Sequence, residues 1–288
     1  MTALPTFTLH NGDDPAFPVL LSVPHAGRDY PGPMLDALRV AAGELLRLED
    51  RYADRLVQPA IAAGFPAIIA NRARAWADLN RAESDYDSGM FSGSGLVTLL
   101  PAPAPSAKTR GGLGLIPRRL QSCGELWRGP FCTTDYCERV EAFHRPYHQA
   151  IDRVLGLMRQ RFGLAILLDV HSMPPLSAAP VPSQFVVGDR YGRSAGSLYS
   201  EILTAHLRQA GYKVALNAPY PGDHILAQHG NPARNIHAIQ LEIDRSLYLD
   251  ASLREPSQQL GQTARLVHSL AVELAGQSIG YGFAEAAE

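Results

Sequence analysis

The chain has 288 residues, of which 46% are hydrophobic, and a formal net charge of −2. A chain of this length and apolar content can bury a large core, and we expect residues 1–288 to form a single domain. A protein with so little net charge lacks the positive surface potential that binding to nucleic acids or anionic membranes requires, so the expected partner is a small molecule.

Five short apolar runs predict buried strands, and four stretches with helical periodicity lie between and after them. In chain order the predicted strands are residues 19–23, 67–70, 166–170, 184–188 and 236–243, and the predicted helices are residues 49–63, 134–161, 194–210 and 258–275. This alternation predicts an α/β fold, a three-layer α/β/α sandwich with a mostly parallel mixed central sheet of the phosphorylase/hydrolase-like kind. Residues 88–114, rich in Gly, Ser, Pro and Ala, predict a long loop that is either a lid or a plain surface insertion.

The cysteines and the amino terminus bear on the compartment. Cys123, Cys132 and Cys137 are odd in number and lack paired spacing, which is typical of reduced thiols. Residues 1–6 have neither the basic nor the apolar segment of a signal peptide, and no later apolar run is long enough to span a bilayer. These features predict a soluble cytoplasmic protein.

Two histidines stand at matching positions, each directly after an apolar run. His25 follows residues 17–24, and His171 follows residues 165–170. Ligands of open α/β sheets gather outside the carboxyl ends of the strands, so the two imidazoles are expected in one crevice. Because neutral imidazole is the commonest metal ligand in proteins, the pattern predicts a shared metal ion.

A catalytic zinc usually has three protein ligands, so a third must come from the carboxylates. Asp50 is one candidate, at the start of the predicted helix 49–63, where an acidic group also complements the helix dipole. Asp29 is a second candidate, four residues after His25. Asp169 shares a strand face with His171 and could instead orient that ring without binding the metal. The residues alone do not rank these three.

Glu242 lies at the end of the last predicted strand, where a carboxylate is costly unless it is paired. If this strand is parallel to the others, Glu242 reaches the rim of the same crevice. It can then act as a general base that takes a proton from metal-bound water and delivers it to the leaving amine. The alternative is a salt bridge to Arg245 or another cation.

Arginines are frequent between residues 72 and 119, and the pair Asn80-Arg81 follows a predicted strand. A guanidinium matches a carboxylate as a planar fork, so this pair suggests a small acidic substrate. Residues 192–196 match the nucleophile-elbow pattern of serine hydrolases around Ser194. Three residues separate this segment from the preceding strand, however, so Ser194 is better interpreted as a helix N-cap, with Gly192 in the turn before it.

Several segments together resemble the N-formylglutamate amidohydrolase family, in the same order and from about residue 17 to residue 250. They are residues 22–27, 78–81, 112–118, 146–148, 168–174 and 237–243. That family is similar to zinc carboxypeptidases and aspartoacylase-like deacylases, whose fold is an α/β/α sandwich around a mixed sheet of about eight strands.

The resemblance implies a zinc ion bound by His25, Asp50 and His171. Asp29 stays open as the acidic ligand, because carboxypeptidase-like enzymes place that ligand close after the first histidine. The resemblance further implies that Glu242 is the general base. It also implies that Asn80 and Arg81 grip the substrate carboxylate and that Arg118 binds a second carboxylate of a dicarboxylic substrate.

The implied activity is a zinc-dependent amidohydrolase that removes a formyl or small acyl group from an N-acyl acidic amino acid. N-formyl-L-glutamate, converted to L-glutamate and formate in histidine degradation, is the expected substrate. Two alternatives are a serine hydrolase that uses Ser194 and a non-catalytic module that binds zinc or a small ligand without turnover.

Overall fold

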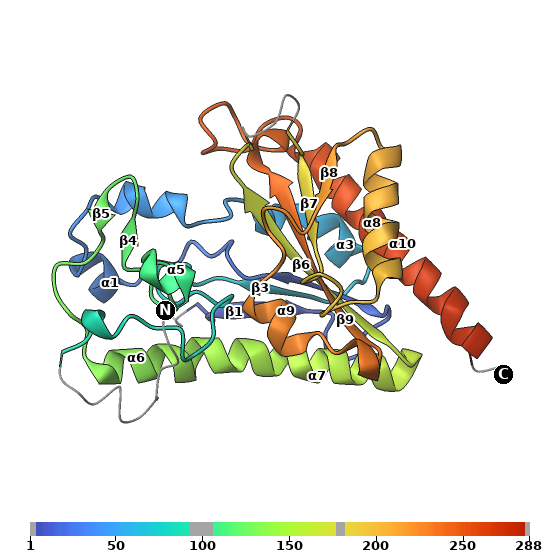
Figure 1. Cartoon of the computed structure of the whole chain (residues 1–288), viewed down its shortest axis with the longest axis horizontal. Coiled ribbons are helices and arrows are strands. Elements are labelled where there is room, and N and C mark those ends of the chain that lie inside the picture. Colours follow the sequence, from blue (N-terminus) through green and yellow to red (C-terminus); the bar gives the residue numbers. More distant parts are fainter. Residues whose placement is uncertain (1–3, 93–105, 177–181, 286–288) are drawn as a thin grey trace.

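The computed structural model describes residues 4–92, 106–176 and 182–285, with the backbone alone over 277–285. Within these ranges seven strands form one mixed sheet in the order β1-β3-β2-β6-β9-β7-β8 (Figure 1). The strands are β1 (Phe7–His10), β2 (Val19–Val23), β3 (Ala67–Ala70), β6 (Ala165–Met173), β7 (Phe185–Gly188), β8 (Val214–Leu216) and β9 (Ile236–Asp244).

Strands β3, β2, β6 and β9 run parallel to one another at the centre of the sheet. Strand β1 is antiparallel to β3, and the parallel pair β7 and β8 is antiparallel to β9. The short strands β4 (Arg119–Leu120) and β5 (Gly124–Glu125) form a separate ribbon. The predicted mostly parallel mixed sheet is therefore confirmed, although its two edge strands, β1 and β8, were not predicted.

Helices cover both faces of the sheet. Helices α2 (Ala53–Leu56), α3 (Gln58–Ala62), α8 (Ser197–Gln209) and α10 (Leu260–Glu285) pack on one face. Helices α7 (Arg145–Phe162) and α9 (His224–His229) pack on the other (Figure 1). This confirms the α/β/α sandwich. The remaining helices are α1 (Gly32–Asp36), α5 (Ala107–Arg110) and α6 (Thr133–Arg139).

Side-chain alternation along the central strands creates the place for a site. On the face covered by α7, the strands begin with buried apolar residues such as Leu20, Leu167 and Ala238. Because side chains two apart share a face, polar residues continue that same face toward the carboxyl ends. They are Ser22, Asp169, His171, Gln240 and Glu242, all of them buried.

Two predicted helices differ from the observed ones. The helix predicted over 49–63 is wrong at its start: Asp50 lies in a turn after a 3₁₀ segment, Ala42–Arg47, and helix begins only at Ala53. Pro59 then separates α2 from α3, because proline has no N–H for the helix ladder. The helix predicted over 134–161 is found as α6 and α7, joined by a π-helical turn, Val140–His144.

Other expectations concern the loop, the thiols and the membrane. Of the predicted loop 88–114, residues 93–105 lie outside the described residues, so the lid stays a prediction. The three cysteines are free, as their spacing predicts. Within the described ranges, no helix has the length and apolar character needed to cross a membrane.

Candidate metal and substrate site

His25, Asp50 and His171 come together at the carboxyl ends of β2 and β6. One ligand atom from each lies within 4.8 Å of the others, and all three residues are buried. His25 occupies the turn after β2, and its carbonyl accepts a hydrogen bond from the Asp50 amide at 2.9 Å. Oδ2 of Asp50 lies 3.1 Å from Nδ1 of His171 and 3.5 Å from Nδ1 of His25.

Each imidazole is oriented by a second, buried carboxylate. Nε2 of His25 donates to Oδ1 of Asp78, and Nε2 of His171 donates to Oδ2 of Asp169, both at 2.7 Å. The Asp169 contact agrees with the shared strand face predicted for it. A proton held on Nε2 leaves a neutral ring with a lone pair on Nδ1, so both lone pairs face the Asp50 carboxylate.

This arrangement fits a zinc ion. Nδ1 of His25 is buried and has no hydrogen-bond partner among the described residues. When both rings are neutral, two nitrogen lone pairs and a carboxylate oxygen face one another and repel. Either a proton, such as one that His171 donates to Asp50 at 3.1 Å, or a metal ion between them removes this repulsion. Two imidazoles and one carboxylate also form a donor set that catalytic zinc uses.

The other carboxylate candidate, Asp29, lies elsewhere. It forms an ion pair with Arg72 at 3.2 Å and lines a separate surface hollow. The geometry therefore favours Asp50 over Asp29 as the carboxylate that joins the two histidines.

Burial raises the pKa of Asp50, but the hydrogen bond from His171 and the charges of His25 and His171 outweigh it and hold this pKa well below its usual value. Burial also raises the pKa of Asp78, which the charges of Arg74 and His25 then lower well below the usual value. Asp50 is thus kept ionised, as a metal ligand must be, and Asp78 is kept ionised as the hydrogen-bond acceptor that orients His25.

Glu242 lines the same cavity, opposite His171 in the register of β6 and β9. The two strands are parallel, which is the condition under which Glu242 was expected to reach the crevice. Its Oε1 accepts a hydrogen bond from Nε2 of Gln240 at 2.9 Å. Burial raises the pKa of Glu242 to about 7, against the opposing charge of His171. Arg245 hydrogen-bonds Ser172 and Asp50, and within the described chain Glu242 has no ion-pair partner.

The cavity has a volume of about 540 Å³, and its walls carry an excess of positive charge. Arg81 lines it as predicted, and Nη1 of Arg81 is 2.5 Å from Oδ2 of Asp223, which also pairs with Lys108. Asn80 uses Oδ1 to accept from the amide of Ile225 at 2.9 Å, so its side chain also holds the start of α9. The other cations on the walls are Arg47, Arg74, Lys108 and Arg245.

Arg118 is not brought to this cavity. Its guanidinium pairs with Asp87 at 2.7 Å and with Glu125 at 2.9 Å, and it is absent from the cavity walls. The geometry therefore does not support the expected role of Arg118, which was to bind a second carboxylate of the substrate. Lys108 belongs to no motif and was not predicted. Arg245 was considered only as a salt-bridge partner of Glu242, and Arg74 only as one of the frequent arginines between residues 72 and 119.

Ser194 lacks the surroundings of a nucleophile. It is fully buried, lines none of the cavity described above, and its hydroxyl has no partner among the described residues. The N-cap interpretation is also wrong, because α8 is capped by Gly196, although Gly192 does lie in the preceding turn with φ of +79°. A serine hydrolase therefore has no support in the geometry.

Comparison of the sequence with known proteins identifies one family. The family model described as N-formylglutamate amidohydrolase matches residues 17–249. An N-formylglutamate deformylase of Pseudomonas putida is 31% identical over 241 residues, covering 81% of this chain and 82% of the relative. One from Pseudomonas aeruginosa is 29% identical over 249 residues, with the same coverage.

Solved structures agree. The N-formylglutamate amidohydrolase from Ralstonia eutropha superposes with a TM-score of 0.86 at 30% identity, covering 96% of this chain and 99% of that one. The gene product Atu2144 from Agrobacterium tumefaciens has a TM-score of 0.65 at 16% identity, covering 96% and 94%, a likeness of fold alone. By sequence and by fold, the chain belongs to the N-formylglutamate amidohydrolase family.

Proposed function

We propose that this protein hydrolyses N-formyl-L-glutamate to L-glutamate and formate with a zinc ion held by His25, Asp50 and His171. The names of the relatives support the reaction. The observation that carries the metal is the pair of buried imidazoles whose Nδ1 atoms both face Oδ2 of Asp50 while carboxylates hold their Nε2 atoms. When bound at such a site, zinc polarises a carbonyl and lowers the pKa of water toward about 7.

Glu242 supplies the proton transfers that the hydrolysis needs. Water adds to the formyl carbon, the C–N bond breaks, and the amine that leaves must gain a proton. Glu242 lines the cavity beside His171, and among the described residues it forms no ion pair. Its carboxylate therefore takes the proton of the attacking water and returns it to the nitrogen of glutamate.

The charge on the cavity walls supports an acidic substrate. A dianion loses hydration on entering the cavity, and desolvated carboxylates need charged hydrogen-bond donors. Arg81 is 3% exposed and held by Asp223 and by the carbonyl of Leu113, which fixes its fork against the cavity. We assign it the α-carboxylate. Lys108 and Arg245, which line the same cavity, are better placed than Arg118 for the side-chain carboxylate.

The test is Glu242→Gln, which keeps the size of the side chain and its capacity to hydrogen-bond Gln240 but removes the base. Zinc content should be unchanged, whereas turnover of N-formyl-L-glutamate should fall by about a hundredfold or more, the range for a lost general base. Loss of zinc would make Glu242 a ligand instead, and unchanged turnover would reject the role. A wild-type protein that binds zinc stoichiometrically but hydrolyses no N-formyl or N-acetyl amino acid would be a binding module.

A further inference from the structure

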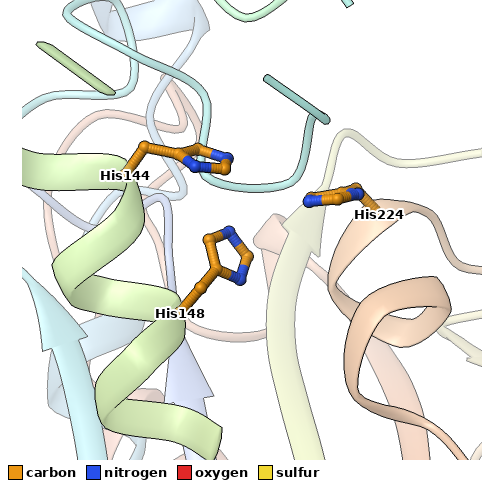
Figure 2. A group of neighbouring side chains, drawn as sticks. All are labelled: His144, His148 and His224. Carbon is orange, nitrogen blue, oxygen red and sulfur yellow. The ribbon is translucent and has the colours of Figure 1, made fainter. Parts of the chain in front are cut away.

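A second group of imidazoles lies outside the catalytic cavity. Figure 2 shows His144 and His148 on one helical segment and His224 facing them from the start of α9. One nitrogen of each ring lies within 4.8 Å of the others. We propose that these three histidines form a second metal site, for a zinc-class transition-metal ion, which goes beyond the hydrolysis proposed above.

His144 has a buried nitrogen that no hydrogen bond uses among the described residues. Its Nε2 donates to the carbonyl of Arg81 at 2.8 Å, so the neutral ring has its lone pair on Nδ1. This Nδ1 has no hydrogen-bond partner among the described residues, and the side chain is only 3% exposed. The residue lies on the π-helical turn before Pro146, and such single-turn bulges occur frequently at functional sites.

His148 belongs to a chain of contacts that lacks one positive charge. Nδ1 of His229 donates to Asp152 at 2.7 Å, so a neutral His229 must accept, through Nε2, from Nδ1 of His148 at 2.8 Å. Nε2 of a neutral His148 then carries a lone pair, 3.0 Å from the carbonyl oxygen of Leu79. Two lone pairs facing each other are unfavourable.

Either an added proton or a metal ion supplies the missing charge. A proton shared by His148 and His229 would leave Nδ1 of His144 without a partner. A metal ion would use the lone pair of His144, and that of His148 once its Nε2 turns away from the carbonyl of Leu79. The unpartnered Nδ1 of His144 therefore favours the metal ion, since imidazole nitrogen suits zinc and its neighbours in the transition series.

His224 and its surroundings give such an ion a third ligand and a way in. Its ring has no hydrogen bond within the described part of the chain and is only partly buried. It borders a cavity of about 440 Å³ that Glu83 also lines. Oε1 of Glu83 lies 3.9 Å from Nδ1 of His144, although Glu83 is engaged by Arg145. Glu83 or water can therefore complete a four-coordinate site.

The position of this site explains what it would do. His144 holds the carbonyl of Arg81, and His148 contacts that of Leu79, so both rings contact the loop that carries the substrate-binding Arg81. His224 begins α9, which Asn80 anchors from the same loop. A metal ion at this point would tie the loop, α7 and α9 together and so fix the position of Arg81.

The experiment is a count of bound zinc. Metal-free full-length protein is equilibrated with excess Zn²⁺, desalted and analysed for metal, as wild type, His224→Ala and His206→Ala. His206 is a matched control, because it is partly buried, hydrogen-bonds Ser269 and belongs to neither histidine group. Wild type and His206→Ala should hold two equivalents. His224→Ala should hold one equivalent, and its affinity for a second zinc ion should fall by more than about tenfold. Tenfold is the smallest loss expected when a residue that only supports a ligand is removed, and His224 is proposed as a ligand itself.

The outcomes separate the two sites. The second site would be overturned if His224→Ala held two equivalents of zinc. It would also be overturned if wild type held one equivalent and His224→Ala retained it. In His171→Ala the second site should keep one equivalent that a further His224→Ala removes. If wild type holds one equivalent that survives His171→Ala but not His224→Ala, the second site stands and the catalytic zinc fails. Equal melting temperatures of metal-free wild type and His224→Ala would show that lost binding does not reflect unfolding.

Discussion

Asp169→Asn should weaken zinc binding although it replaces none of the proposed zinc ligands. Asp169 is fully buried and accepts hydrogen bonds from Nε2 of His171 and from the hydroxyl of Ser22, each at 2.7 Å. The carboxylate makes the His171 ring a stronger donor through Nδ1 and holds its orientation. Asparagine keeps the size of the side chain and one acceptor oxygen but removes the charge, so the effect isolates the electrostatic support of the ring.

The expected size follows from this geometry. Loss of an orienting partner of a metal-bound histidine weakens metal binding by about 10- to 100-fold, or about 1.4 to 2.7 kcal/mol. Asp189→Asn is the matched control, because Asp189 is also buried and also accepts from a serine hydroxyl, that of Ser200, at 2.7 Å. Among the described residues Asp189 hydrogen-bonds no histidine, so its variant should bind zinc as the wild type does.

The assay is competition for Zn²⁺ against a chromophoric chelator at constant pH. To restrict the measurement to the catalytic site, both variants are compared in a His224→Ala background. The reasoning is refuted if folded Asp169→Asn competes as well as its parent, or if Asp189→Asn weakens binding by the same factor. Either result would mean that the contact between Asp169 and His171 has no bearing on a metal.

Four further substitutions test the substrate contacts and the rejected nucleophile. Arg81→Lys should lower kcat/KM on every N-formyl amino acid by about tenfold or more, because lysine cannot form the bidentate fork. Arg118→Met should leave the preference for N-formylglutamate over N-formylleucine unchanged, whereas Lys108→Met should reduce it. The measurement is the ratio of the two kcat/KM values; if this ratio changes only in Arg118→Met, Arg118 binds the side-chain carboxylate after all. Ser194→Ala should retain turnover, and a loss of turnover in this variant would support the serine hydrolase mechanism instead.

The convergence of the site could be predicted because it follows from strand geometry. His25, His171 and Glu242 each follow or end an apolar run, and the carboxyl ends of parallel strands meet at one edge of a sheet. The position of Asp169 follows from the two-residue period of a strand. These inferences needed only local pattern and one rule of topology.

Contacts made by loops could not be predicted in this way. Nothing local distinguishes Asp50 from Asp29, since both lie outside the named helices and strands, in segments whose path depends on the packing of the rest of the chain. Asp78 was noticed only as part of a motif with Arg81, yet it orients His25 from 53 residues away. Arg118 is withheld from the cavity by Asp87 and Glu125, two carboxylates whose proximity depends on the fold of their loop.

The second histidine group shows the same limit. His144 and His148 are four residues apart in the sequence, and a helix alone brings them together. His224 joins them only because α9 and α7 pack on the same face of the sheet. A spacing rule therefore finds two of the three rings, and the fold supplies the third.

The most direct test of the proposed function compares one protein preparation with and without its metal. Formate release from N-formyl-L-glutamate is measured after exhaustive removal of metal by a chelator and again after addition of Zn²⁺, for wild type and for His171→Ala. Turnover should vanish in the metal-free wild type, return with Zn²⁺, and stay absent in His171→Ala. Full turnover by metal-free wild type, or recovery of His171→Ala to the wild-type rate, would contradict a zinc enzyme built on His25, Asp50 and His171.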